Sequence, residues 1–153
     1  MLDQVLYFIY LIFLIVAIGP NVTYAVWIQR AFVSNRESLS FTLRTIKVIN
    51  DRMVLPAVVL ALITWVAMVY LSGQNLAIPW VLLTAVFWLA VFLLGLFGYR
   101  PTLLKQIELG ESAGPDSDEY SSTAWRSTLI GIAIGIIALL IVLLMAFQPA
   151  LWG

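Results

Sequence analysis

The sequence predicts an all-α integral membrane protein built as a bundle of four transmembrane helices. Hydrophobic residues make up 63% of the 153 residues and charged residues 10%, whereas a soluble domain has roughly 45–50% and about 25%. A soluble fold of this size could not bury so much apolar surface. Four apolar segments are each long enough to cross a hydrocarbon core of about 30 Å. None of them shows the alternation that is typical of a membrane β-strand.

The predicted spans cover residues 5–28, 53–71, 78–99 and 129–147, within a single domain of residues 1–153. They contain no Asp, Glu, Lys, Arg or His. The residues before the first span lack the positive charge of a signal peptide, which predicts an uncleaved span.

The first span is predicted to be kinked, because Pro20 removes one helical N–H and crowds the carbonyl of Val16. Asn21 and Tyr24 follow at i and i+3 and could form a small polar face beside the break. Broken helices build ligand sites in some transporters. Gly19, Pro20, Asn21 and Tyr24 are therefore a candidate ligand site, and a purely structural kink is the alternative.

The basic residues predict the orientation of the bundle. All eight lie in the two connections at residues 30–52 and 100–126, and none lies in the opposite connection. An even number of spans puts these connections on one side, which the positive-inside rule assigns to the cytoplasm. Both termini are then expected in the periplasm or outside the cell. Trp27, Tyr99 and Trp125 fit an aromatic belt at the inner boundary.

The first connection has a net charge of +3 and carries the basic segment Arg36, Arg44, Lys47 and Arg52. This segment could bind anionic lipid headgroups, dock on a partner or remain a solvated extension of the second span. Residues 38–52 are predicted to be helical, with Ser38 or Ser40 as the N-cap. One apolar face is predicted from the spacing of a set of residues: Leu39, Leu43, Ile46 and Met53.

The second connection has a net charge of −2, and residues 110–119 form a polar linker rich in helix breakers. Its acidic residues Asp116, Asp118 and Glu119 have a spacing too generic to predict a metal site. Electrostatic attraction between the two connections is expected, and it is weak where the charges are exposed.

The fourth span has a face of small residues at Ser127, Gly131, Gly135 and Ala138. Small residues at this spacing allow another helix to approach closely. This face is therefore predicted to pack against another span of the chain or against another membrane protein.

Several functions are disfavoured by what the sequence lacks. It contains no Cys and no His, and its net charge is zero. These absences remove disulfides, thiolate catalysis and the usual haem and zinc ligands. No Walker loop, dinucleotide fingerprint or nucleophile elbow is present. The sequence predicts no catalytic residue, no cofactor, no metal and no nucleic-acid partner.

With these landmarks placed, the whole chain resembles a bacterial four-span membrane family known as domain of unknown function 2269. The resemblance rests on short motifs: Gly19-Pro20-Asn21, Trp27, Arg30, Asp51-Arg52, Pro56, Pro79-Trp80, Arg100-Pro101, Met145 and Gln148-Pro149. The family is distantly similar to copper-resistance D-type membrane domains. Many members carry a His early in the first span, which this chain lacks, so no His-dependent metal or haem role is carried over. The resemblance implies a bacterial inner-membrane location.

The leading hypothesis is a non-enzymatic accessory subunit that packs beside other membrane proteins or beside itself in the bilayer. The alternative is a small oligomeric transporter or channel with its site at Gly19-Pro20-Asn21. A polar cavity at that level would favour the alternative, and dry packing of Asn21 and Tyr24 would exclude it. An enzyme acting on lipid headgroups through Asp116 and Asp118 is a third and weaker alternative.

Overall fold

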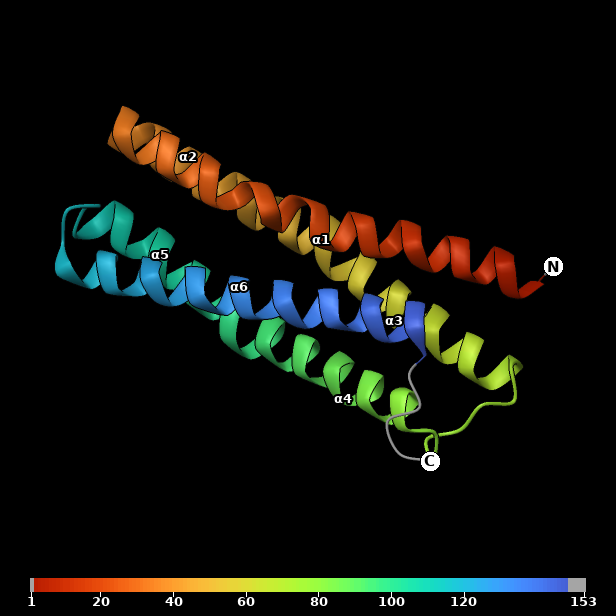
Figure 1. Ribbon diagram of the computed structural model, residues 1–153. Helices are drawn as coiled ribbons and strands as arrows, with labels where there is room; N and C mark the ends of the chain where they lie inside the picture. Colours follow the sequence, from red (N-terminus) through yellow and green to blue (C-terminus); the bar gives the residue numbers. More distant parts are fainter. Residues whose placement is uncertain (1, 149–153) are drawn as a thin grey trace.

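The protein is an antiparallel bundle of four long helices, and the computed structural model describes residues 2–148 (Figure 1). The first long helix is α1 (Leu2–Ser34). The second consists of α2 (Arg36–Ile49), η1 (Asn50–Val54) and α3 (Leu55–Leu71). The third consists of α4 (Pro79–Leu93), η2 (Leu94–Tyr99) and α5 (Arg100–Ser112). The fourth is α6 (Asp118–Phe147).

All four long helices are apolar enough to cross a membrane, and they are longer than a bilayer requires. The candidate spans contain 31, 35, 34 and 30 residues, which at 1.5 Å per residue gives about 45–53 Å. The predicted spans are therefore the apolar parts of longer helices. Most of the two connections at residues 30–52 and 100–126 is helical and continues the long helices past the predicted spans.

Two ends of the bundle can be defined from its turns. The basic end is where α1 meets α2 and where residues 113–117 join α5 to α6. The opposite end is where α3 meets α4 through residues 72–78, and where α1 begins and α6 ends (Figure 1). The segments that carry the eight basic residues lie in the half toward the basic end.

The N-cap of α2 is Asn35 and not Ser38 or Ser40. The Asn35 side chain accepts a hydrogen bond of 2.7 Å from the Ser38 backbone N–H, which satisfies a free donor of the first turn. The prediction was wrong because an Asn just upstream supplies the same cap, so the helix begins two residues earlier. The polar linker is also shorter than predicted, since α5 continues to Ser112.

The predicted apolar face of residues 38–52 is confirmed in its first three positions, because Leu39, Leu43 and Ile46 are buried. Met53 is exposed, and Val54 is buried in its place. The cause is η1, a π-helical turn that holds about one more residue than an α-helical turn. The extra residue shifts the register, so the buried side moves from position 53 to 54.

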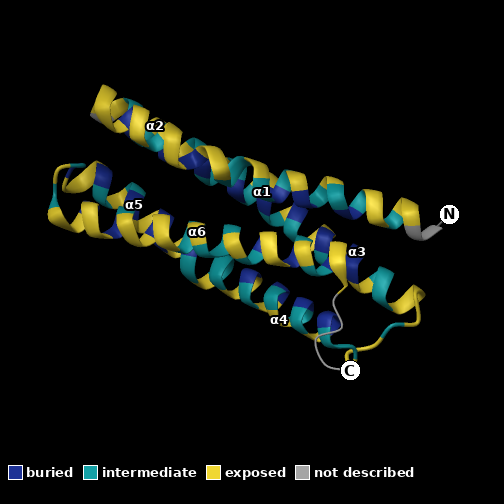
Figure 2. Ribbon diagram, in the orientation of Figure 1, coloured by how far each residue is buried: buried dark blue, intermediate teal, exposed yellow. Residues whose placement is uncertain are grey.

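The helices pack as two units, because α1 lies mainly against α2 and α3, and α6 lies mainly against α4 and α5. Exposed residues alternate with buried ones along every long helix (Figure 2). Many of the exposed residues in the predicted spans are large and apolar, as lipid contact requires. Two buried clusters hold the units together. The aromatic cluster lies toward the opposite end and contains Tyr10, Leu14, Ala61, Trp65, Trp80, Val81, Trp88, Val91, Ile141 and Met145. The basic-end cluster contains Tyr24, Ala31, Leu39, Leu43, Ile46, Tyr99, Leu103 and Tyr120.

Candidate functional site

A cavity of about 370 Å³ lies inside the bundle, where the helices of the two units diverge between the two clusters. Side chains from all four long helices line it, and most of them are apolar. A volume of this size falls within the range of ordinary small-molecule sites, roughly 300–1,000 Å³. Among residues 2–148, no Asp, Glu, Lys or Arg lines the cavity. The cavity is therefore lined by uncharged side chains from the apolar spans and from the adjoining parts of the two connections.

The polar groups of the cavity gather on its side toward the basic end. Tyr24 comes from α1, Asn50 from η1, Tyr99 from η2, Gln106 from α5 and Ser127 from α6, and all five are buried. The side toward the opposite end is lined by apolar residues and one indole: Leu14, Trp88, Val91, Ala138 and Ile141. The cavity thus has a polar side and an apolar side, as an amphipathic molecule has a polar and an apolar part.

Two of the polar residues reach the cavity because of π-helical turns. Asn50 is the first residue of η1 and Tyr99 is the last residue of η2. Both π turns interrupt the central helices, and each also contributes an apolar lining residue, Val54 and Gly95. Single π turns in α-helices occur frequently at functional sites, because they turn one side chain away from the regular face.

Pro20 lies inside α1, which is helical on both sides of it, and the kink expected there stays a prediction. The Asn21 side chain donates a hydrogen bond of 2.8 Å to the carbonyl of Ala17. Thr23 donates one of 2.8 Å to the carbonyl of Pro20. Both side chains thus bond back to carbonyls of their own helix. Asn21 and Tyr24 both line the cavity, whereas Gly19 and Pro20 lie outside its lining.

Three polar atoms of cavity-lining residues are buried without a hydrogen bond that meets the usual geometry among the described residues: Tyr24 Oη and Gln106 Oε1 on the polar side, and Trp88 Nε1 on the apolar side. The Gln106 amide nitrogen donates to the Tyr120 hydroxyl at 3.2 Å, so only its oxygen is free. Buried polar atoms in folded proteins are nearly always paired, and an exception calls for an explanation. A bound molecule in the cavity would supply the missing partners.

The small-residue face of α6 borders the same cavity, since Ser127, Gly131, Gly135 and Ala138 all line it. A Cβ added at Gly135 would meet no atom within 4 Å, and one added at Gly131 would lie 3.7 Å from the Tyr99 ring. Within this chain the glycines widen the cavity and do not support a close helix contact. Packing of this face against a partner remains a prediction.

The basic segment forms ion pairs within the chain. Lys47 Nζ lies 3.2 Å from Asp51 Oδ2, and Arg100 Nε lies 3.4 Å from Asp51 Oδ1. Asp51 belongs to η1 and Arg100 directly follows η2, so this carboxylate links the two π turns beside the cavity.

A second ion pair joins the two connections, because Arg44 Nε donates to Glu111 Oε1 at 2.8 Å. This pair confirms the expected attraction between the connections, and its exposed position makes it weak. Arg52 lies in η1 and is exposed. Arg36 begins α2, and its side chain lies outside the described part of the structure.

Sequence reasoning missed Asn50, Tyr99 and Gln106 as site residues. Tyr99 was expected in the aromatic belt, but it is buried because η2 turns it inward. Asn50 is the polar member of the apolar series 39, 43, 46 and 50, and that position is the signal that could have identified it. Gln106 carries no such signal, since it lies in a polar connection.

The acidic residues Asp116, Asp118 and Glu119, in the α5–α6 loop and the first turn of α6, do not form a metal centre within the described part of the chain, where no three His, Cys, Asp or Glu residues come together. The polar groups at the cavity are hydroxyls and amides, which bind neutral molecules through hydrogen bonds. The site is therefore suited to recognition of an uncharged ligand.

Comparison with known proteins supports the membrane assignment. No curated protein and no solved structure matches the chain. The model of one family, described as predicted integral membrane protein (DUF2269), matches residues 4–149. The fold, with its four long apolar helices, agrees with that description. The chain therefore belongs to the DUF2269 family, whose members are integral membrane proteins of unknown function.

Proposed function

We propose that this protein is a non-enzymatic membrane protein that binds an uncharged amphipathic molecule in the cavity between its helices. The observation that carries the proposal is the pair of unpartnered atoms, Tyr24 Oη and Gln106 Oε1, on the polar side of an otherwise apolar cavity. The apolar side accommodates a hydrocarbon chain, and the polar side binds a headgroup.

The free atoms define the chemistry of that headgroup. An amide oxygen only accepts hydrogen bonds, so the ligand must donate one to Gln106. A hydroxyl can donate or accept, so Tyr24 accommodates either kind of group. A charged headgroup does not fit, because an unpaired charge buried in an apolar site is strongly unfavourable. The carboxylate of Asp51 already has two cationic partners. The ligand class is an amphiphile with a neutral, hydroxyl-bearing headgroup.

Photocrosslinking tests the proposal with a defined probe, a monoacylglycerol that carries a diazirine in its acyl chain. In the wild-type protein we expect crosslinks on α1 and α6 at residues that face the cavity, Leu14, Ile18, Ala138 and Ile141. Excess unlabelled monoacylglycerol should compete. A carboxylate probe with the same chain should label the cavity much less.

Gly135→Leu and Gly19→Leu form a matched pair for this experiment. A Cβ added at either position has no neighbouring atom within 4 Å. Only position 135 lines the cavity. Gly135→Leu should reduce crosslinking several-fold, and Gly19→Leu should leave it unchanged. Labelling confined to outward-facing residues, or equal labelling in both variants, would contradict the proposal.

An accessory subunit of a larger membrane assembly is the second candidate. The cavity opens between α1 and α6, where its apolar lining residues Val22 and Ile132 are exposed. A neighbouring helix could cover this opening. Purification in mild detergent separates the candidates, because proteins that copurify in fixed stoichiometry favour the accessory subunit. A lone monomer that retains the probe favours the binding protein.

We infer the orientation from charge, with the basic end in the cytoplasm and both termini in the periplasm of a bacterial inner membrane. The support is that the basic residues lie in segments at one end of the bundle. The chain has no natural cysteine, so the labelling of a single introduced cysteine reports on which side of the membrane that position lies. Val33→Cys at the basic end should resist an impermeant thiol reagent in intact cells, and Ser72→Cys at the opposite end should react. Reaction at both positions would overturn the assignment.

A further inference from the structure

A second pocket lies at the opposite end of the bundle. It has a volume of about 220 Å³ and is lined by residues of every long helix: Tyr7, Trp65, Met68, Val69, Ser72, Gln74, Trp80, Met145 and Gln148. Its polar members come from the end of α3, the following turn and the C-terminal end of α6. The bundle thus holds two hollows, one on each side of the aromatic cluster.

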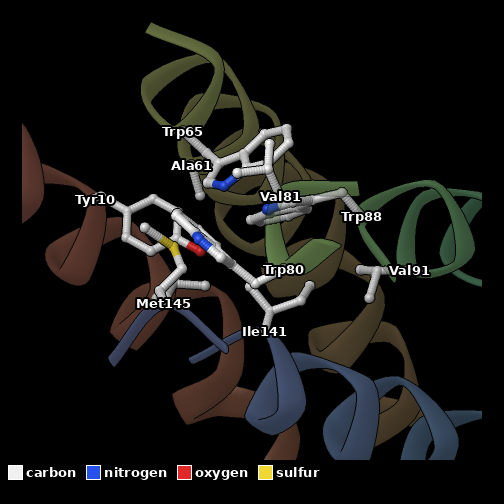
Figure 3. Close-up of a cluster of buried hydrophobic side chains, with 10 residues drawn as sticks. Tyr10, Ala61, Trp65, Trp80, Val81, Trp88, Val91, Ile141 and Met145 are labelled. Atoms are coloured by element: carbon white, nitrogen blue, oxygen red, sulfur yellow. The ribbon is translucent and has the colours of Figure 1, made fainter. Parts of the chain in front are cut away.

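The aromatic cluster separates the two hollows by a short distance. On α6, Ile141 lines the cavity and Met145 lines the second pocket. Four helical residues correspond to about 6 Å along the axis. Figure 3 shows the cluster side chains meeting across the bundle, with Tyr10, Trp65, Trp80 and Trp88 among them. The cluster contributes lining residues to both hollows, Leu14, Trp88, Val91 and Ile141 to the cavity and Trp65, Trp80 and Met145 to the second pocket.

The aromatic cluster, which is the barrier between the two hollows, contains buried polar groups that are poorly paired. The indole nitrogen of Trp65 has no hydrogen bond among the described residues, and the Tyr10 hydroxyl and the Trp88 indole nitrogen have at most a weak contact with each other. Tyr10 and Trp88 pack edge to face, with ring centroids 6.4 Å apart. A purely structural core would satisfy such groups or omit them. Trp88 also lines the cavity and Trp65 also lines the second pocket, so the free donors continue from one hollow to the other.

We propose that the two hollows and the barrier form a passage that carries an uncharged, hydroxyl-bearing headgroup from one leaflet of the bilayer to the other. The inference rests on the proposed function, because the same cavity is its first binding site. The Tyr10 hydroxyl and the two indole N–H groups replace water as hydrogen-bond partners while the headgroup crosses. The apolar chain remains in lipid through the opening beside Val22 and Ile132. A charged headgroup finds no counter-charge along this route and is rejected.

The test uses the full chain in proteoliposomes that contain a trace of NBD-labelled glucosylceramide, which is uncharged and rich in hydroxyls. Dithionite destroys only the fluorescence of the outer leaflet unless the lipid crosses. Wild-type vesicles should lose clearly more fluorescence than protein-free vesicles. Vesicles with NBD-labelled phosphatidylglycerol, which is anionic, should lose only the outer-leaflet fraction.

Variants of the barrier identify the route. Tyr10→Phe removes one hydroxyl and keeps the ring, and it should slow the crossing several-fold. The matched control Tyr70→Phe removes an exposed hydroxyl and should have no effect. Trp88→Ala opens the barrier and should speed the crossing, whereas Trp125→Ala changes an exposed residue and should not.

The outcomes distinguish the two proposals. Crosslinking of the monoacylglycerol probe without any crossing of glucosylceramide would overturn the passage and leave the binding site in place. If the wild-type protein is not crosslinked by the monoacylglycerol probe, both the binding site and the passage are overturned. Crossing of phosphatidylglycerol at the same rate, or equal rates for Tyr10→Phe and wild type, would also overturn the passage through this barrier.

Discussion

The regions around the basic-end cluster and the aromatic cluster differ in how many of their polar groups form hydrogen bonds or ion pairs. Toward the basic end, Gln106 and Tyr120 bond to each other, Asp51 has two cationic partners, and Arg44 pairs with Glu111. Three other atoms of this region lack a hydrogen bond among the described residues, Tyr24 Oη, Gln106 Oε1 and Asp51 Oδ1. In the aromatic cluster, by contrast, none of the buried polar atoms of Tyr10, Trp65 and Trp88 has such a bond. The two regions are joined by continuous helices, so the difference is not caused by separate domains.

This difference indicates a division of roles along the bundle. Local bonds and dense aliphatic packing at the basic end hold the helices together. The aromatic cluster lies between two hollows and contains buried hydrogen-bonding groups without full partners, which are costly for stability. A region that is unfavourable for folding and persists is a candidate for function. Four measurements test this division, and each compares a variant at one position with a matched variant elsewhere in the bundle.

The largest effect is expected for a core truncation at the basic end. Ile46 is completely buried in the basic-end cluster, and Ile46→Ala should destabilise the protein by about 2–4 kcal/mol through lost burial and a new cavity. Val48→Ala on the exposed side of α2 should change stability by less than about 0.5 kcal/mol. Unfolding of the detergent-solubilised protein by SDS titration measures both. Equal effects would show that the basic end does not hold the bundle together.

Two tyrosine variants compare a partnered hydroxyl with an unpartnered one within the basic-end cluster. Tyr120→Phe removes the acceptor of the Gln106 amide and should cost about 1–2 kcal/mol, because a buried donor loses its partner. Tyr24→Phe removes a hydroxyl that has no partner in the described structure and should cost less than about 0.5 kcal/mol. The same titration in ligand-free detergent measures both. A larger loss for Tyr24→Phe would indicate a partner for its hydroxyl and weaken the case for a free binding group.

The contribution of each ion pair to stability should increase with the burial of its carboxylate. Asp51 is mostly shielded and bridges the two π turns, so Asp51→Asn should cost about 1 kcal/mol. Glu111→Gln breaks a more exposed pair and should cost less than about 0.5 kcal/mol. Added salt should reduce the Glu111 effect more than the Asp51 effect. If both variants behave alike, the bridge does not fix the π turns.

The smallest effects come from two glycine variants. Gly135→Ala adds a Cβ in open space and should stabilise the protein by about 0.5–1 kcal/mol, because Ala favours a helix more than Gly does. At the basic end, a Cβ at Gly110 would lie 3.4 Å from the Tyr120 ring. The steric contact should cancel the gain in Gly110→Ala. Thermal unfolding monitored by circular dichroism measures both, and a loss of stability in Gly135→Ala would mean that the cavity is filled.

Some site residues were within reach of the sequence and others were not. Asn21 and Tyr24 were predicted together, because they follow a proline at helical spacing and this relation is local. The small residues of α6 were also recognised, but their place at a cavity depends on the distance to neighbouring helices. Tyr99 was assigned to the aromatic belt because it lies at the end of the third predicted span, and that position alone does not show that η2 contains it and that its side chain is buried.

The sequence by itself determined that four apolar helices cross a membrane and that the basic residues belong to two connections. Both properties depend on the local content of apolar and charged residues along one segment. Only the tertiary structure decided which polar residues meet, because Asn50, Tyr99 and Gln106 come from three elements whose relative rotation is set by π turns and packing. It also decided that the helices diverge around a cavity. That divergence depends on how side chains of four helices fit together, which no single segment contains.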